Sequence, residues 1–163
     1  MPPKMELKDM HNLDIKKDVV QKSHIITKDF QFAKKYSFDE RKEMAQRVQD
    51  QSPGRIPVVV EISPVVHREL HQHLRDEKVY FERFKALGGN TIAELVILSR
   101  NIFFKTPIAA EAGVFFYVGD ASDIAMCSLS STVSDIANKK RSPDGWLYFL
   151  MTVEATFGSN NTS

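Results

Sequence analysis

The segment from Ile56 to Ile62 constrains the fold of this chain more than any other part of the sequence. It is rich in β-branched residues and almost continuously apolar. A short run of this kind is typical of a strand that is buried on both faces, and Pro57 is acceptable because it stands near the beginning of the strand. We therefore predict that this segment is a central strand of a sheet.

The composition is that of an ordinary globular domain. The chain has 163 residues, of which 42% are hydrophobic and 26% are charged, and its formal net charge is +1. This balance allows one domain with a real core, and it excludes a protein that collects nucleic acid through its net charge. Cys127 is the single cysteine, so an internal disulfide is excluded.

Targeting and membrane signals are absent from the sequence. Met1 to Met10 contains no apolar run that could serve as a signal peptide, and no stretch approaches the roughly eighteen apolar residues of a membrane span. We expect the chain in the cytosol or nucleus. Any association with a membrane would have to come from a covalent lipid or an amphipathic surface.

The N-terminal part divides into an extension and the beginning of the folded domain. Residues 1–29 are charged and hold too few apolar residues for a core, so we expect a disordered or loosely helical extension. Ser37 and Glu40 then have the spacing of a capping box ahead of a short helix. Pro53 and Gly54 should end this helix before the central strand.

A second strand and the main helix follow. Arg83–Leu87 alternates charged and apolar residues and is predicted to be a short strand, and residues 67–82 before it to be a surface helix or loop. Thr91 and Glu94 repeat the capping-box spacing before the apolar segment Ile92–Leu98. The apolar surface of this helix is wider than one core-facing stripe requires, which leaves a surplus for a partner.

The remaining segments complete an α+β order. Gly113–Val118 has the aromatic and β-branched content of a strand, and Leu129–Ile136 carries apolar residues at helical spacing. Residues 142–145 form a turn, after which Trp146–Val153 is the last strand. One main helix packed across a small mixed sheet is most economically a β-grasp fold.

Motifs in three parts of the chain resemble one family. Tyr36–Lys42 together with Gly54–Glu61 resembles an aromatic-Pro-Phe-Glu-x-Arg start followed by an Arg-(Ile/Val)-Pro-Val-x-x-Glu strand. Asp144–Tyr148 looks like an Asp-Gly-(Phe/Tyr)-Leu-Tyr strand, and Thr156–Gly158 looks like a Thr-Phe-Gly terminus. In this order and spacing the motifs are similar to the autophagy-related protein 8 (GABARAP-type) family of ubiquitin-like modifiers. The resemblance covers roughly residues 30–158 and implies a ubiquitin-like β-grasp with N-terminal helices packed on the mixed sheet.

The resemblance implies a specific chemistry at the C-terminus. A cysteine protease would cut between Gly158 and Ser159, with Phe157 seated before the scissile bond, and remove residues 159–163. Activating and conjugating enzymes would then transfer the Gly158 carboxylate to phosphatidylethanolamine. Glycine suits these steps because it has no Cβ to obstruct a narrow tunnel or attack on its carbonyl. No other cofactor is implied. Two acyl chains would hold the protein on the autophagosome membrane, whereas the free form would be cytoplasmic.

The resemblance also implies a groove for cargo receptors. Family members accept short aromatic-x-x-aliphatic peptides with acidic flanks alongside their second strand, which is β-augmentation. By position, the acidic flank would meet Arg55, Arg83 and Lys85. The aromatic pocket would be formed by Met44, Val48, Pro57, Val59 and Trp146, and the aliphatic pocket by Phe84, Ala86, Leu87, Leu95 and Leu98.

This chain departs from the family pattern at several groove positions. Met44 stands where an acidic residue is usual, Ile102 where arginine is frequent, Lys85 where an aliphatic residue is usual, and Leu87 where proline is usual. The connection over residues 67–82 is longer than in the family, and residues 119–139 hold another insertion. We expect an altered ligand preference in a divergent member.

Three other interpretations compete with this one. His67, His71 and His73 have spacings that suggest zinc, although no further ligand lies close in sequence and a solvated helix face is the simpler explanation. Cys127 with a distant histidine could form a hydrolase pair, but nothing resembles a nucleophile turn, so we do not expect an enzyme. The serious alternative is a ubiquitin-like binding module that is not lipidated, or a modifier conjugated to a protein.

Overall fold

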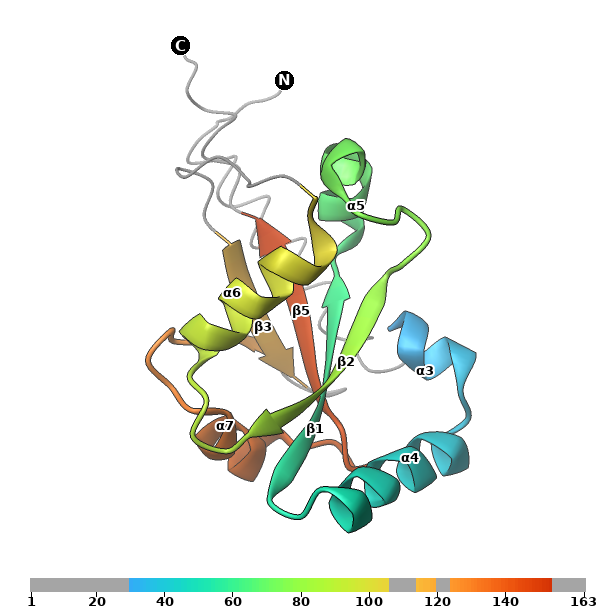
Figure 1. Ribbon diagram of the computed structural model, residues 1–163, viewed down its shortest axis with the longest axis vertical. Coiled ribbons are helices and arrows are strands. Elements are labelled where there is room, and N and C mark those ends of the chain that lie inside the picture. The colour runs from blue at the N-terminus through green and yellow to red at the C-terminus, as the bar shows by residue number, and fades with distance from the viewer. Residues whose placement is uncertain (1–29, 106–113, 120–123, 154–163) are drawn as a thin grey trace.

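The computed structural model describes residues 30–105, 114–119 and 124–153, and its centre is a five-stranded mixed sheet (Figure 1). The strand order is β2-β1-β5-β3-β4. β1 pairs antiparallel with β2 and parallel with β5, and β3 pairs antiparallel with both β5 and β4. This arrangement confirms the predicted α+β class. The strands are β1 (Arg55–Ile62), β2 (Phe81–Leu87), β3 (Val114–Gly119), β4 (Ile124–Met126) and β5 (Leu147–Val153).

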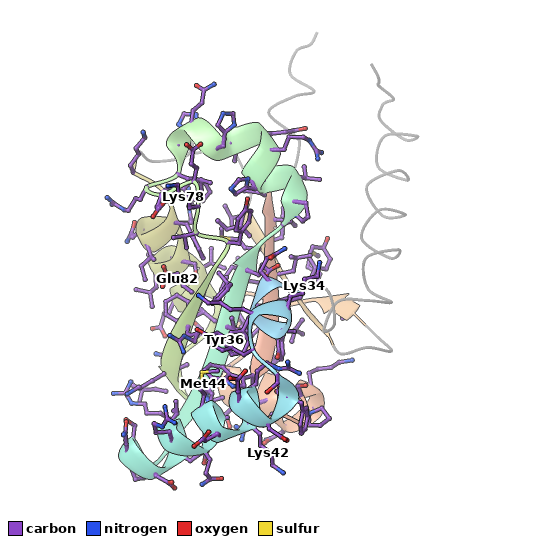
Figure 2. The ribbon with its side chains drawn as sticks, turned by 90° about the vertical axis from the view of Figure 1, so that its right-hand side faces the viewer. Lys34, Tyr36, Lys42, Met44, Lys78 and Glu82 are labelled. Carbon is purple, nitrogen blue, oxygen red and sulfur yellow. The ribbon has the colours of Figure 1, made fainter. Side chains whose placement is uncertain are left out.

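Helices cover both faces of the sheet and divide the core into two clusters. One cluster lies under α3 (Gln31–Lys35) and α4 (Phe38–Gln51) and contains Phe32 and Trp146. The other lies under α6 (Ile92–Phe103), which crosses the opposite face in Figure 1, and under α7 (Val133–Lys140). Figure 2 shows the face that carries α3 and α4. The N-terminal helices are therefore packed on the mixed sheet as predicted.

The local signals at the helix ends are confirmed. Ser37 and Glu40 form a capping box at α4, with the Glu40 N–H 3.1 Å from Ser37 Oγ and the Ser37 N–H 2.8 Å from Glu40 Oε1. Thr91 and Glu94 do the same at α6. After α4 the chain turns at Gly54, whose φ of 87° is a conformation that glycine adopts without strain. β1 is buried along its whole length after Arg55, as a strand inside the sheet should be.

Some elements differ from the prediction. The surface helix is α5 (Pro64–Leu70), which begins earlier than expected because Ser63 caps it and Pro64 suits its first turn. It continues into the short 3₁₀ helix η1 (His71–His73). Leu129 lies before α7 rather than in it. The short elements α3 and β4 were not predicted, because so few residues show no clear periodicity.

Glu61 on β1 anchors α3 to the sheet. Its side chain is buried, and its Oε1 atom accepts a 2.7 Å hydrogen bond from the backbone N–H of Gln31. Burial raises the pKa of Glu61 to about 8, although the N–H groups of Gln31 and Phe32 and the charge of Lys34 oppose this rise. The folded protein therefore holds a proton on Glu61 at a pH where the unfolded chain does not.

This proton makes the stability of the protein depend on pH. Between about pH 4.5 and pH 8 the folded state binds more protons than the unfolded state, so the free energy of unfolding should fall as the pH rises through this window. The total fall should be about 2–5 kcal/mol. Glu61→Gln should flatten the dependence, whereas Glu69→Gln on the exposed side of α5 should retain it. Urea unfolding at several pH values tests this, and equal slopes in the wild type and Glu61→Gln would contradict it.

Candidate functional site

β2 forms one edge of the sheet and presents different side chains to its two faces. It pairs only with β1 in the described part of the sheet. Arg83 and Lys85 are exposed on the face that carries α4, whereas Phe84 and Ala86 point to the side of α6 and pack against its core cluster. An edge strand of this kind offers unpaired backbone groups to another strand.

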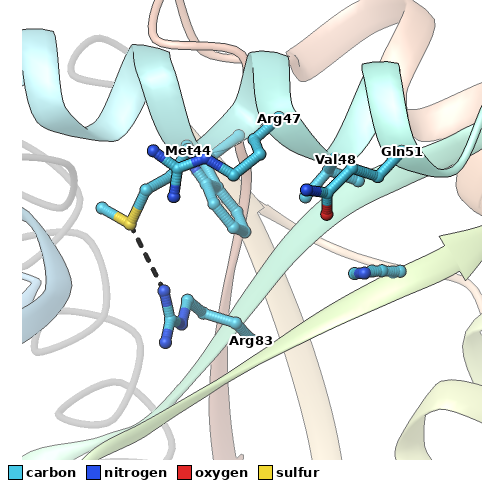
Figure 3. Close-up of a pocket in the computed structure, with 7 residues that line it drawn as sticks. Met44, Arg47, Val48, Gln51 and Arg83 are labelled. Carbon is cyan, nitrogen blue, oxygen red and sulfur yellow. Dashed lines mark hydrogen bonds between the residues drawn. The ribbon is translucent and has the colours of Figure 1, made fainter.

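A pocket of about 320 Å³ lies between α4 and β2 (Figure 3). Its walls include three residues of the predicted aromatic pocket, namely Met44, Val48 and Trp146, and both Arg83 and Lys85. Pro57 and Val59 are instead buried in β1, and the exposed fraction of Val59 is 0%. The described residues that line it are Met44, Arg47, Val48, Gln51, Arg83, Lys85 and Trp146.

Two residues of the lining were not predicted. Arg47 and Gln51 follow Met44 and Val48 on the same face of α4, at spacings of three and four residues. Side chains at these spacings lie beside one another on a helix. Helical periodicity could therefore have identified both residues once Met44 and Val48 had been placed at the pocket.

Hydrogen bonds hold both the side chain and the backbone of Trp146. Its indole Nε1–H donates to the carbonyl oxygen of Arg41 over 2.8 Å, and its backbone N–H donates to Asp144 Oδ1 over 2.9 Å. Asp144 Oδ2 accepts from Arg41 Nε at 2.8 Å and from the Tyr148 hydroxyl at 2.5 Å. These bonds join α4 to β5 beneath the pocket.

The surroundings of Tyr148 show how completely this network is buried. Tyr148 is 1% exposed and Asp144 is also 1% exposed. Burial, and next the hydrogen bond to Asp144, hold the pKa of Tyr148 far above its usual range. Tyr148 therefore stays protonated and keeps donating to the carboxylate.

The predicted aliphatic pocket is only partly assembled on the other side of β2. Leu95 and Ala86 are buried in the core, with exposed fractions of 4% and 5%. Leu98 on α6 is 45% exposed, and Phe84 is half-buried. Leu87 is 48% exposed, but strand alternation assigns it to the same face as Lys85 rather than to that of Phe84.

The basic residues predicted for the acidic flank lie close together along the edge. Arg55 pairs across the strands with Leu87, and its Nη1–H donates to the carbonyl oxygen of Lys85 over 2.9 Å. Arg83 stands two residues before Lys85 on the same face. The terminal residues Phe157, Gly158 and Ser159 lie outside the described residues, in which β5 ends at Val153.

The described residues support neither the metal interpretation nor the hydrolase interpretation. His67 Nε2 contacts the carbonyl oxygen of Glu77 at 2.7 Å while its ring stacks on Tyr80. No group of three or more potential metal ligands is gathered in the described residues. Burial raises the pKa of the Cys127 thiol to about 12, which leaves very little thiolate at neutral pH. The described residues also hold no helix that is long and apolar enough to cross a membrane.

Comparisons with known proteins agree with this geometry. The family model "Autophagy protein Atg8 ubiquitin like" matches residues 40–158. Autophagy-related protein 8 of Dictyostelium discoideum is 26% identical over 131 residues, which are 79% of this chain and 94% of the relative. Autophagy-related protein 8e of Arabidopsis thaliana is 26% identical over 126 residues, covering 76% of this chain and 89% of the relative.

A solved structure shows the same fold. The crystal structure of Trypanosoma brucei ATG8 covers 77% of this chain and 96% of its own, with a TM-score of 0.59 at 21% sequence identity. This likeness confirms the ubiquitin-like fold. Members of the matching family are ubiquitin-like modifiers rather than enzymes, and this chain is not an enzyme. Because the family model matches most of the sequence, the chain belongs to the Atg8 family of ubiquitin-like autophagy proteins.

Proposed function

We propose that this chain is a lipid-conjugated autophagy modifier that recruits cargo receptors during autophagosome formation. The observation that carries the proposal is the edge of β2, which pairs only with β1 among the described residues and has a pocket on the side of α4 and exposed apolar side chains on the side of α6. An extended peptide could add a strand to this edge and place alternate side chains on the two sides.

The two sides of β2 suit an aromatic-x-x-aliphatic peptide. Met44 and Val48 give the pocket a partly exposed apolar wall for the aromatic residue, and Trp146, which is 2% exposed, lies behind them. Leu98 and Phe84 offer apolar surface for the aliphatic residue. The main chain of the peptide would supply affinity through strand pairing, and the basic groups along the edge would attract acidic residues before the aromatic one.

The C-terminal chemistry is the second half of the proposal. A cysteine protease would cut after Gly158 and release residues 159–163, and activating and conjugating enzymes would join the new carboxylate to phosphatidylethanolamine. Gly158 lies five positions after Val153, the last residue of β5, so the modified carboxylate would be within about 18 Å of the end of the strand. The unmodified protein would be cytoplasmic and the conjugate would lie on the autophagosome membrane.

The alternative is a ubiquitin-like binding module that is not lipidated, or a modifier that is conjugated to a protein. Both alternatives would use the same edge of β2 and differ only in the fate of Gly158. Binding experiments test the groove, and recovery of the protein from its own cells tests the terminus.

A pair of charge substitutions on α6 tests the groove. Leu98 and Ile97 are both exposed, at 45% and 59%, but they lie about 100° apart around the helix. Ile97 shares its flank with Ala93, whose backbone N–H donates to the carbonyl oxygen of Leu129 over 3.0 Å. For a peptide with two acidic residues before the aromatic one, we expect micromolar binding that Leu98→Glu weakens about tenfold or more. Ile97→Glu should change binding little.

Amide shift mapping with titration measures this difference. Shifts should follow β2 and the adjacent parts of α4 and α6. Because both leucine and isoleucine are exposed, neither substitution should unfold the protein. Equal losses in the two variants, or shifts confined to another face, would remove the groove from the proposed function.

A further inference from the structure

Among the described residues, the lining of the pocket between α4 and β2 combines an apolar wall with positive charges and contains no acidic residue. Trp146, Met44 and Val48 form the apolar part of the lining, whereas Arg47, Gln51, Arg83 and Lys85 form the polar part. Each of the charged residues in this set is basic. The pocket therefore differs from a purely apolar pocket, which would suit an uncharged ring.

The described residues offer little negative charge to balance the positive charges of Arg47, Arg83 and Lys85. The Arg83 Nη1–H contacts the neutral sulfur of Met44 at 3.3 Å. Arg47 lies 3.6 Å from Glu43, but the side chains are 55% and 73% exposed, and exposed pairs of this kind are weak. Lys85 makes no side-chain hydrogen bond or ion pair with the described residues. Like charges around one pocket repel one another, and a bound anion would relieve this repulsion.

The guanidinium groups of Arg47 and Arg83 lie at the same end of the pocket as Met44. In Figure 3 the guanidinium groups of Arg47 and Arg83 both lie near Met44, one from α4 and the other from β2. Val48 and Gln51 lie further along α4, away from this pair. A flat ring could therefore lie along α4 against Val48 while a group at its tip reaches the two guanidinium groups.

We propose that the pocket accepts a phosphotyrosyl side chain at the aromatic position of a bound peptide. The inference rests on the proposed function, because it assumes that a peptide adds to β2. A phosphate carries a charge of about −1.5 to −2 and accepts several hydrogen bonds, and guanidinium groups bind it through two parallel N–H donors. The aromatic ring supplies the apolar contact that an isolated phosphate lacks. Phosphorylation of tyrosine in the receptor would then strengthen binding.

The test compares three peptides of the same sequence. The first has tyrosine at the aromatic position, the second has phosphotyrosine there, and the third has unmodified tyrosine preceded directly by phosphoserine. We expect the phosphotyrosine peptide to bind about tenfold more tightly than the tyrosine peptide, because hydrogen bonds to charged groups are stronger than neutral ones. This preference should shrink as the salt concentration rises.

Matched variants locate the phosphate. Arg83→Met should remove most of the preference for phosphotyrosine, because it should weaken binding of the phosphotyrosine peptide far more than binding of the tyrosine peptide, which also meets Arg83 through its acidic flank. Lys42→Met is the control, because Lys42 is an exposed lysine on α4 that does not line the pocket. It makes the same change of charge and should keep the preference at its wild-type value. Arg83 is exposed, so its substitution should not unfold the protein.

The possible outcomes separate the inference from the proposed function. If the tyrosine peptide binds as tightly as the phosphotyrosine peptide or more tightly, the inference is wrong and the groove remains. If the phosphoserine peptide binds most tightly, or if Arg83→Met and Lys42→Met reduce the preference for phosphotyrosine equally, the phosphate of phosphotyrosine does not bind in this pocket and the inference is wrong. If none of the peptides binds, the proposed peptide-binding function fails together with the inference.

Discussion

Asp144→Ala is expected to lower the free energy of unfolding by about 3–5 kcal/mol, because it would leave a buried arginine without its counter-charge. Asp144 is 1% exposed and accepts hydrogen bonds from Arg41, Tyr148 and the backbone of Trp146. The Arg41 side chain is only 12% exposed, so water cannot fully replace the lost carboxylate. The thermal midpoint should fall by roughly 10–20 °C. Peptide binding should also weaken, because Trp146 would lose the hydrogen bond to its backbone N–H.

A double-mutant cycle distinguishes this cause from general damage to the core. Arg41→Met should also be destabilising, because it leaves the Asp144 carboxylate buried without the guanidinium. The double variant Arg41→Met, Asp144→Ala should lose less stability than the sum of the two single losses. Asp50→Ala is the matched control. Asp50 is exposed and accepts only from Gln46 in the described structure, so its removal should cost about 0.5 kcal/mol or less. Additive losses within the cycle would contradict a coupled pair.

The parts of the fold that were predicted correctly depend on signals within short segments. The two capping boxes need residues only three positions apart, and β1 shows its burial directly in its apolar run. The alternation in β2 also separated Arg83 and Lys85 from Phe84 and Ala86, whereas Leu87 was grouped with Phe84 although it lies on the face of Lys85. Such signals survive folding because tertiary packing acts in the same direction as local preference.

The elements that were missed have no such local signal. β4 contains three residues and α3 contains five, which is too short for a period to appear. α3 is instead held by Glu61, which is 30 residues away from Gln31 in the sequence. The contact between Arg41 and Asp144 spans 103 residues, so neither residue could be assigned to the other from its own surroundings. Both contacts depend on the assembled sheet.

The candidate site was predicted only in part, because some of its features also depend on contacts between elements that are far apart in the sequence. Family position assigned Met44, Val48 and Trp146 to one pocket, and the structure brings these three residues together in the lining between α4 and β2. It also indicated Val59, but position along a motif does not show whether a side chain lies on the surface of a groove or beneath it. Helical periodicity could have added Arg47 and Gln51 to Met44 and Val48, but their position across the pocket from Arg83 and Lys85 depends on the packing of α4 against β2. The basic character of the pocket is therefore a property of two elements together.

Gly158→Ala is expected to abolish conjugation to phospholipid while leaving the fold unchanged. In its own cells the wild-type protein should lose residues 159–163 and then gain the mass of phosphatidylethanolamine. Alanine at this position adds a methyl group after the last described strand, which ends at Val153, so we expect the thermal midpoint to stay at the wild-type value. The same methyl group should obstruct the narrow tunnels and the acyl transfer of the conjugating enzymes.

Gly89→Ala is the matched control for this change. A Cβ at Gly89 would have no heavy atom within 4 Å, so the same chemical substitution should be tolerated there and conjugation should continue. Membrane fractionation followed by intact-mass measurement compares the three proteins. An unprocessed wild type, or a Gly158→Ala protein that still sediments with membranes, would exclude the lipid-conjugated modifier and leave a binding module that acts through the edge of β2 alone. Loss of conjugation in Gly158→Ala but not in Gly89→Ala, with both variants folded, would assign the modification to residue 158 rather than to the stability of the domain.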